Sequence, residues 1–154
     1  MHVITESLLI GNIDDAREPA ATVSALLIVA EECVVTPPPW VTFVQIPMQE
    51  FAPADPATLS RAVDWLEKHL PSNRIMVCCR AGIGRSASVV IAYLCCAQSM
   101  AYGEAARFVM ARRPGAVPLP QLQDAIQEVL RLRQDGDRLT EGVKKRSRAT
   151  PRVA

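Results

Sequence analysis

The feature that most constrains the fold is a loop with two glycines between a buried strand and a helix. Residues 77–88 read VCCRAGIGRSAS, after the apolar strand-like run RIMVC at 74–78. A helix is expected from Arg85, because SASVVIAYLCCA is apolar and too long for a strand. A loop from a strand's carboxyl end into a helix is typical of α/β folds, where ligands bind at that edge.

Further strands and helices alternate along the chain and predict the same fold class. The expected strands are 7–10, 24–30, 41–48 and 74–78, and the expected helices are 14–21, 55–70, 85–97, 102–112 and 119–130. Asp55-Pro56 marks one helix start, as an N-cap residue followed by proline. We expect a single α/β domain over residues 1–133, with a central, largely parallel sheet flanked by helices.

Composition narrows the classes of protein. A chain of 154 residues fits one domain, and its net charge of +1 does not indicate a nucleic-acid partner. Val89–Ala97 is the longest apolar run and is about half of the ~20 residues that a membrane span needs. Five cysteines, without zinc-ligand spacing, predict free thiols in a reducing compartment. We therefore expect a cytoplasmic protein without a signal peptide, metal or cofactor.

Residues 134–154 differ from the rest of the chain because they are polar and basic. We expect this tail to be disordered. Its cations could serve as a nuclear signal or contact an anionic membrane, although we interpret them as a solvated end: Lys144, Lys145, Arg146 and Arg148. The sequence does not indicate an oligomeric state.

The loop itself has the composition of an oxyanion site. Backbone N–H groups entering a helix converge on one point, and the helix dipole adds positive potential. Gly82 and Gly84 permit positive φ, and the Arg85 guanidinium can bind two oxygens. The candidate phosphate-binding residues are Arg80, Ala81, Gly82, Ile83, Gly84, Arg85 and Ser86.

Cys79 is the candidate nucleophile at this loop. A helix N-terminus and a nearby cation favour the reactive thiolate form of cysteine. Transfer of phosphorus to sulfur would give a cysteinyl-phosphate, and Ser86 could donate a hydrogen bond to the departing sulfur. A buried core cysteine is the alternative interpretation. It suits Cys95 and Cys96, but it predicts neither the glycines nor the arginine beside Cys79.

The segment CRAGIGRS resembles the Cys-x5-Arg-Ser/Thr signature of the protein tyrosine phosphatase superfamily, and most closely its small (atypical) dual-specificity members. ITESLLIGN, IPMQEFAPAD and ARRPGAVPLPQL resemble flanking segments of that family in the same order, so the likeness covers about residues 4–133. The low-molecular-weight phosphatases and arsenate reductases share the loop but have it near the N-terminus. The resemblance implies metal-independent hydrolysis of phosphotyrosine and phosphoserine/threonine in protein partners.

The same resemblance implies a general acid about thirty residues before the cysteine, where the family has aspartate. Glu50 precedes Cys79 by 29 positions and follows IPMQ, as the family's acid does; Asp55 precedes it by 24. We favour Glu50, because Asp55 is explained by its place as an N-cap. Glutamate reaches further than aspartate, so proton transfer could be slower, and Glu50 could also be a solvated loop carboxylate.

Cys78 is a second departure, because the family has histidine before the nucleophile, understood to hold the loop by hydrogen bonds. His2 and His69 are the only histidines, and neither lies in the loop. A thiol is a weaker hydrogen-bonding group, so we expect a rate optimum at higher pH than is usual for the family. Cys78 could form a disulfide with Cys79, but the more economical interpretation is a core residue on the opposite side of the strand.

Three functions are compatible with these residues. The first is an active phosphoprotein phosphatase with a shallow pocket, and the second is a pseudophosphatase that binds phosphorylated partners with little turnover. The third is a redox or sulfur-transfer protein that uses Cys78 and Cys79. Ile83 and the absence of lysine from the loop disfavour phosphoinositide substrates. We favour the active phosphatase, because Cys79, Arg85 and Ser86 are all present.

Overall fold

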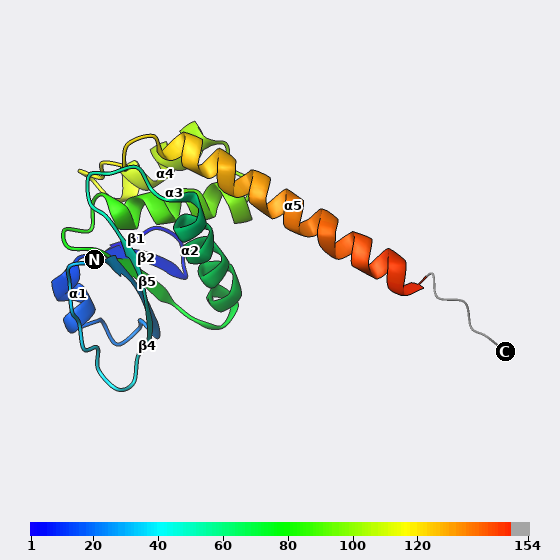
Figure 1. Cartoon of the computed structure of the whole chain (residues 1–154). Coiled ribbons are helices and arrows are strands. Elements are labelled where there is room, and N and C mark those ends of the chain that lie inside the picture. The colour runs from blue at the N-terminus through cyan, green and yellow to red at the C-terminus, as the bar shows by residue number, and fades with distance from the viewer. Residues whose placement is uncertain (149–154) are drawn as a thin grey trace.

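The computed structural model describes residues 1–148 and contains one five-stranded sheet in the order β1-β2-β5-β3-β4 (Figure 1). The strands are β1 (His2–Val3), β2 (Leu8–Gly11), β3 (Ala25–Ala30), β4 (Thr42–Met48) and β5 (Ile75–Cys78). The last four pair in parallel, and β1 pairs antiparallel with β2. The predicted α/β class and the largely parallel sheet are confirmed, whereas the short β1 was not foreseen.

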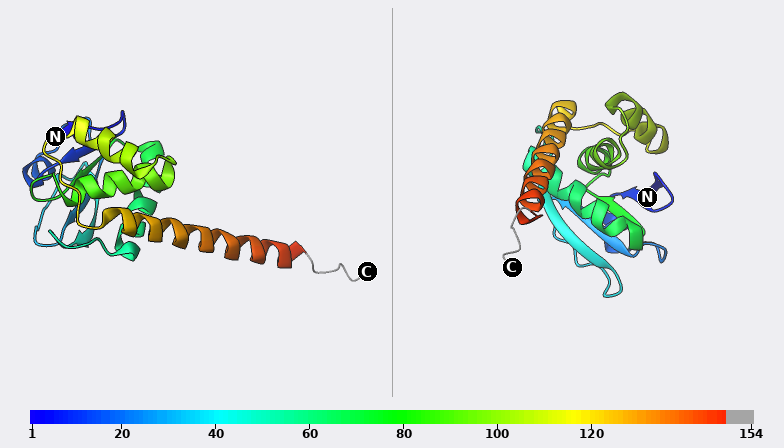
Figure 2. Two further views of the ribbon diagram at one scale, coloured as in Figure 1. Left: turned by 90° about the horizontal axis from the view of Figure 1, so that it is seen from above. Right: turned by 90° about the vertical axis from the view of Figure 1, so that its right-hand side faces the viewer.

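Helices cover both faces of the sheet. They are α1 (Ile13–Arg17), α2 (Pro56–His69), α3 (Arg85–Ala97), α4 (Tyr102–Arg112) and α5 (Leu122–Arg148). One apolar cluster joins the sheet to α2–α5, and a second joins the opposite face to α1 and the neighbouring loops. Figure 2 shows α3, α4 and α5 together on one side of the sheet. Strand β3 serves both clusters, because Leu27 and Val29 contribute to the first while Leu26 and Ile28 contribute to the second.

The helix ends follow local capping chemistry. The Asn12 side chain accepts a hydrogen bond from Asp15 N, and the Asp15 carboxylate accepts one from Asn12 N, which forms a capping box for α1. Helix α1 ends at Arg17, earlier than expected, because Glu18 precedes a proline. Asp55 caps α2 by accepting from Thr58 N and Oγ1, as its position before Pro56 predicted.

The prediction of disorder from residue 134 is wrong for residues 134–148, which continue α5 away from the body of the protein (Figure 1). The helix is already nucleated where Leu122, Ile126 and Val129 pack on the core, and adding residues to an existing helix is much easier than starting one. Polar composition therefore excluded burial of this segment but not helix. The rest of the predicted tail, residues 149–154, lies outside the described residues. No helix within residues 1–148 is both long enough and apolar enough to cross a bilayer.

Candidate active site

The predicted phosphate-binding loop follows β5, which lies in the middle of the sheet between β2 and β3. Residues 79–84 form the loop, and Arg85 and Ser86 begin α3. Cys79 therefore directly follows the carboxyl end of a central strand, at the start of the loop that leads to the N-terminus of α3. The predicted site lies at the edge where parallel sheets bind ligands.

The carbonyl groups of residues 80–84 each accept a hydrogen bond from a residue outside the loop. Arg80 O accepts from Ile13 N (3.2 Å), Ile83 O from Val117 N (2.8 Å), and Gly84 O from Ser88 N (2.9 Å). Ala81 O and Gly82 O accept from the Arg113 guanidinium, at 3.3 and 2.8 Å. In a trans peptide the N–H points opposite to the C=O, so the N–H groups of residues 81–85 point into the loop. Five inward donors make a cradle for an oxyanion.

Position 82 is the place in the loop where the backbone conformation requires glycine. Its φ is +68°, and a Cβ atom there would lie 2.7 Å from the carbonyl oxygen of Gly11. Gly84 does not adopt positive φ, contrary to the expectation for both glycines; its φ is −103°. A Cβ on Gly84 would meet only Val117 O, at an ordinary 3.6 Å.

The two adjacent cysteines face opposite sides. Cys79 Sγ lies 3.2 Å from Ser86 Oγ, and its side chain belongs to the α2–α5 side of the core. Cys78 belongs to the cluster on the α1 side, where burial raises the pKa of its thiol. Both thiols are free. The interpretation of Cys78 as a core residue is confirmed, and no disulfide links it to Cys79.

Arg85 is buried and paired with Glu32, a carboxylate that was not among the predicted site residues. Its side chain is 1% exposed, and its Nη1 and Nη2 donate to the two carboxylate oxygens of Glu32 at 2.6 and 2.7 Å. Nη1 also donates to Met48 O at 3.1 Å. The Glu32 hydrogen bonds raise the pKa of Arg85, and the same bonds lower the pKa of Glu32 to about 2. The guanidinium is fixed in place and charged.

The Nε atom of that guanidinium differs from the two Nη atoms. Arg85 Nε is buried and has no hydrogen-bond partner among the described residues. A buried, charged donor without a partner is costly, so its position indicates a ligand acceptor. Together with the inward N–H groups, Arg85 Nε fits an oxygen of a bound phosphate.

A signal for Glu32 was present in the sequence. It follows the buried run SALLIVA, so it stands at the carboxyl end of β3, next to the end of β5. The rule that located the phosphate loop applies equally to this neighbouring strand. Glu32 also lies 3.3 Å from Arg80 Nε, and so it balances two loop arginines.

The structure brings Glu50 to the loop and leaves Asp55 at its helix. Glu50 Oε2 lies 3.5 Å from Arg85 Nη2, with about a third of its side chain exposed. Asp55 is engaged as the cap of α2. Phe51 follows Glu50 with φ at +61° and is 84% exposed, a strained conformation for a bulky residue. Such strain is characteristic of functional loops.

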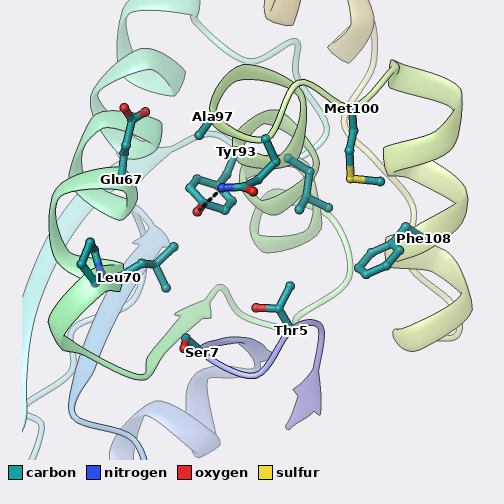
Figure 3. A pocket seen from close by; sticks show the side chains of 11 residues that line it. Thr5, Ser7, Glu67, Leu70, Tyr93, Ala97, Met100 and Phe108 are labelled. Atoms are coloured by element: carbon teal, nitrogen blue, oxygen red, sulfur yellow. Dashed lines mark hydrogen bonds between the residues drawn. The ribbon is translucent and has the colours of Figure 1, made fainter.

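The largest cavity described, of about 610 Å³, lies elsewhere (Figure 3). Its lining includes Thr5, Ser7, Tyr93, Met100 and Phe108, and it includes none of residues 79–86. Thr5 and Ser7 precede the amino end of β2, whereas the candidate phosphate-binding loop follows the carboxyl end of β5, which is parallel to β2. The cavity therefore lies toward the opposite ends of the strands. Within residues 1–148, no group of three or more His, Cys, Asp or Glu side chains is placed to hold a metal ion.

Comparison with known proteins identifies the family of this chain. Residues 19–131 match the family model "Dual specificity phosphatase, catalytic domain". The human Dual specificity protein phosphatase 16 is 38% identical over 78 residues, which are 49% of this chain and 12% of that protein. The chain thus spans only a small part of this relative's length.

Solved structures share the fold. Human DUSP28 superposes with a TM-score of 0.77 at 22% identity, covering 88% of this chain and 99% of that one. PTPMT1 in complex with PI(5)P superposes with a TM-score of 0.72 at 18% identity, covering 84% and 94%. These likenesses concern the fold. The family match covers residues 19–131, most of the chain, and so the chain belongs to the family of dual-specificity phosphatase catalytic domains.

Proposed function

We propose that this protein is a phosphoprotein phosphatase that hydrolyses phosphotyrosine and phosphoserine/threonine esters through a cysteinyl-phosphate. The observation that carries the proposal is the unpartnered, buried Arg85 Nε beside a loop whose N–H groups of residues 81–85 point inward. A tetrahedral dianion satisfies these donors. Cys79 begins the same loop, so its sulfur would meet the phosphorus of a bound ester.

In the first step the Cys79 thiolate attacks phosphorus, an S–P bond forms and the ester P–O bond breaks. The leaving oxygen needs a proton, which we assign to the carboxyl group of Glu50. Glu50 Oε2 lies 3.5 Å from Arg85 Nη2, so the carboxyl group is next to the guanidinium that is expected to hold the phosphate. The backbone donors and Arg85 stabilise charge on the phosphoryl oxygens as the bond breaks.

In the second step water attacks phosphorus and the S–P bond breaks, which releases inorganic phosphate. The Glu50 carboxylate takes a proton from the attacking water and so returns to its acid form. The sulfur leaves as a thiolate, and Ser86 Oγ, 3.2 Å away, can donate a hydrogen bond to it. Ser86 should therefore act mainly on this step.

We infer protein phosphoesters as the substrate class because residues 79–86 carry no cation besides Arg80 and Arg85. Arg80 is itself paired with Glu32. PTPMT1, a neighbour in fold alone, was solved with PI(5)P, which makes that phosphoinositide the competing substrate to test. Hydrolysis of PI(5)P in preference to phosphopeptides would overturn the assignment of substrate class.

The test is hydrolysis of para-nitrophenyl phosphate and of a phosphotyrosine peptide from pH 5 to 8 under reducing conditions. The variants are Cys79→Ser, Glu50→Gln and Asp55→Asn. We expect Cys79→Ser to abolish turnover and Glu50→Gln to lower kcat on the peptide by about 10²–10⁴-fold, the usual contribution of a general acid. Asp55→Asn should affect stability more than rate. Equal loss in both acid variants would contradict the assignment of Glu50.

A pseudophosphatase is the second candidate, favoured by glutamate at the acid position and by Cys78, which lies in an apolar cluster away from the loop interior. The same experiment separates the two functions. Phosphopeptide binding by wild type without turnover would identify a binding protein. Turnover that depends on Cys79 would exclude this alternative.

A further inference from the structure

We propose that Arg113 is a positioning residue that keeps the phosphate-binding loop in its oxyanion-binding shape from outside. The inference rests on the proposed function, because it assumes that the loop binds phosphate. It concerns a residue that follows α4 and is 34 positions from Cys79 in the sequence. Arg113 is not assigned contact with the substrate.

Arg113 binds two successive peptide groups of the loop. Its Nε donates to Gly82 O at 2.8 Å, and its Nη2 donates to Ala81 O at 3.3 Å. The residue is itself held, because its backbone N–H donates to Val109 O at 2.8 Å and its Nη1 donates to Pro114 O. A half-buried guanidinium fixed in this way is a rigid clamp.

The orientation of these two carbonyl groups sets the direction of two of the N–H groups that point into the loop. Holding Ala81 O and Gly82 O outward turns the N–H groups of Gly82 and Ile83 toward the inside of the loop. Gly82, at φ +68° and without a side chain, is where the backbone can most easily rotate. A rotated peptide would present a carbonyl oxygen to the anion in place of an N–H. Arg113 opposes that rotation.

Among the described residues, Ala81 O and Gly82 O accept from no backbone N–H, unlike the carbonyl groups on either side of them. Arg80 O and Ile83 O are held by backbone N–H groups, those of Ile13 and Val117. Within residues 1–148, Arg113 is the only residue that donates to Ala81 O and Gly82 O. The positive charge of the guanidinium also polarises both peptides, which strengthens their N–H groups as donors.

Arg112 provides a matched control. It is the neighbouring arginine, its guanidinium stacks on the Phe108 ring at 3.5 Å, and its Nη1 donates to Phe108 O. Arg112→Met removes the same charge at nearly the same place but no contact with the loop. Any difference between Arg112→Met and Arg113→Met therefore reports the loop contacts.

The experiment measures phosphate binding without requiring turnover. Wild type, Arg113→Met, Arg113→Lys and Arg112→Met are treated with iodoacetamide at increasing inorganic phosphate, and alkylation of Cys79 is followed by peptide mass spectrometry. Phosphate should protect Cys79 in wild type and Arg112→Met. We expect about tenfold more phosphate to be needed in Arg113→Met, as for the loss of one or two aligned donors. Lysine should restore part of the affinity, because it can bind one carbonyl.

Steady-state kinetics and folding controls complete the test. With para-nitrophenyl phosphate, Arg113→Met should raise KM and the inhibition constant of phosphate together, which general loss of folded protein would not do. Urea unfolding of each variant shows whether the protein is folded. If Arg113→Met does not fold, Arg113→Lys must still show a weakened affinity for phosphate.

The outcomes separate the two proposals. Equal phosphate affinity in Arg113→Met and Arg112→Met would overturn the positioning role, even if wild type is an active phosphatase. Wild type without turnover, but with phosphate protection that weakens in Arg113→Met, would refute the catalytic proposal and support the positioning role. Wild type in which phosphate gives no protection of Cys79 would refute the positioning role, because the loop would then not be an oxyanion site.

Discussion

Replacing Glu32 by glutamine tests how the protein tolerates the buried charge of Arg85 beside the candidate phosphate-binding loop. The change keeps the size of the side chain but removes the charge that faces Arg85. Glutamine offers one acceptor oxygen, whereas the carboxylate accepts from both Nη1 and Nη2. Arg85 is 1% exposed and would stay charged with one hydrogen bond fewer. The variant should therefore be less stable at neutral pH.

The size of the effect follows from the carboxylate. Hydrogen bonds from Arg85 lower the pKa of Glu32 from 4.5 to about 2. At about 1.4 kcal/mol per pKa unit, this corresponds to roughly 3 kcal/mol of stability. The Glu32 side chain is 31% exposed, and water screens part of the interaction. We expect Glu32→Gln to lower the free energy of unfolding by about 1–3 kcal/mol at pH 7.

The pH dependence has a defined sign. The pKa of Glu32 is lower in the folded than in the unfolded protein, so its contribution is fully present above pH 4.5. It is lost as the pH falls from 4.5 toward 2. The difference in unfolding free energy between wild type and Glu32→Gln should be constant from pH 7 to about 5.5 and should narrow below about pH 4.5.

The assay is urea unfolding followed by circular dichroism at several pH values. Glu31→Gln is the matched control, because this neighbouring, exposed glutamate forms no ion pair within the described residues. It should change the unfolding free energy by less than about 0.5 kcal/mol. The reasoning is refuted if Glu32→Gln is no more destabilising than Glu31→Gln, or if their difference grows as the pH falls below 4.5.

Three further changes have expected outcomes. Gly82→Ala should abolish phosphate binding and lower the free energy of unfolding in urea by more than about 2 kcal/mol, because its Cβ would lie 2.7 Å from Gly11 O. Gly115→Ala is the control, since Gly115 has a similar φ of +81° but nothing within 4 Å of the added Cβ. It should lower the free energy of unfolding by only about 1 kcal/mol. Ser86→Ala should slow hydrolysis of the phosphoenzyme, seen as a larger burst of para-nitrophenol before steady turnover; an unchanged burst would contradict the assigned hydrogen bond. Gly136→Ala, in an exposed turn of α5, should increase helicity and add up to about 1 kcal/mol of local helix stability, and unchanged circular dichroism would argue against a helix there.

Much of the arrangement of this candidate site could be predicted, because most of its residues lie in one short segment. Cys79, Gly82, Arg85 and Ser86 lie within eight residues, and a loop between strand and helix constrains where each can point. The fold class was equally accessible, since buried parallel strands have continuous apolar runs. Asp55 was recognised as a cap for the same reason, because capping depends on neighbours in the sequence.

What could not be predicted depends on contacts between distant segments. Glu32 is 53 positions from Arg85, and Arg113 is 31 from Gly82. The position after β3 places Glu31 and Glu32 at the loop's end of the sheet, but no local pattern shows that Glu32, rather than Glu31, will face Arg85. The helical state of residues 134–148 was missed for a related reason, because it depends on the packing of the preceding turns on the core. Composition alone reported only that the segment is not buried.

The outward hydrogen bonds of the loop have a consequence for the newly synthesised chain. Their donors extend from Ile13, near one end of the chain, to Val117, which emerges from the ribosome long after Cys79. A nascent chain that has not yet released Arg113 and Val117 carries the complete nucleophile sequence without the donors to Ala81 O, Gly82 O and Ile83 O. Contacts so distant in sequence form late and slowly in folding. Phosphoester chemistry should therefore be absent from truncated or partly folded chains, and activity should appear together with the final packing of the domain.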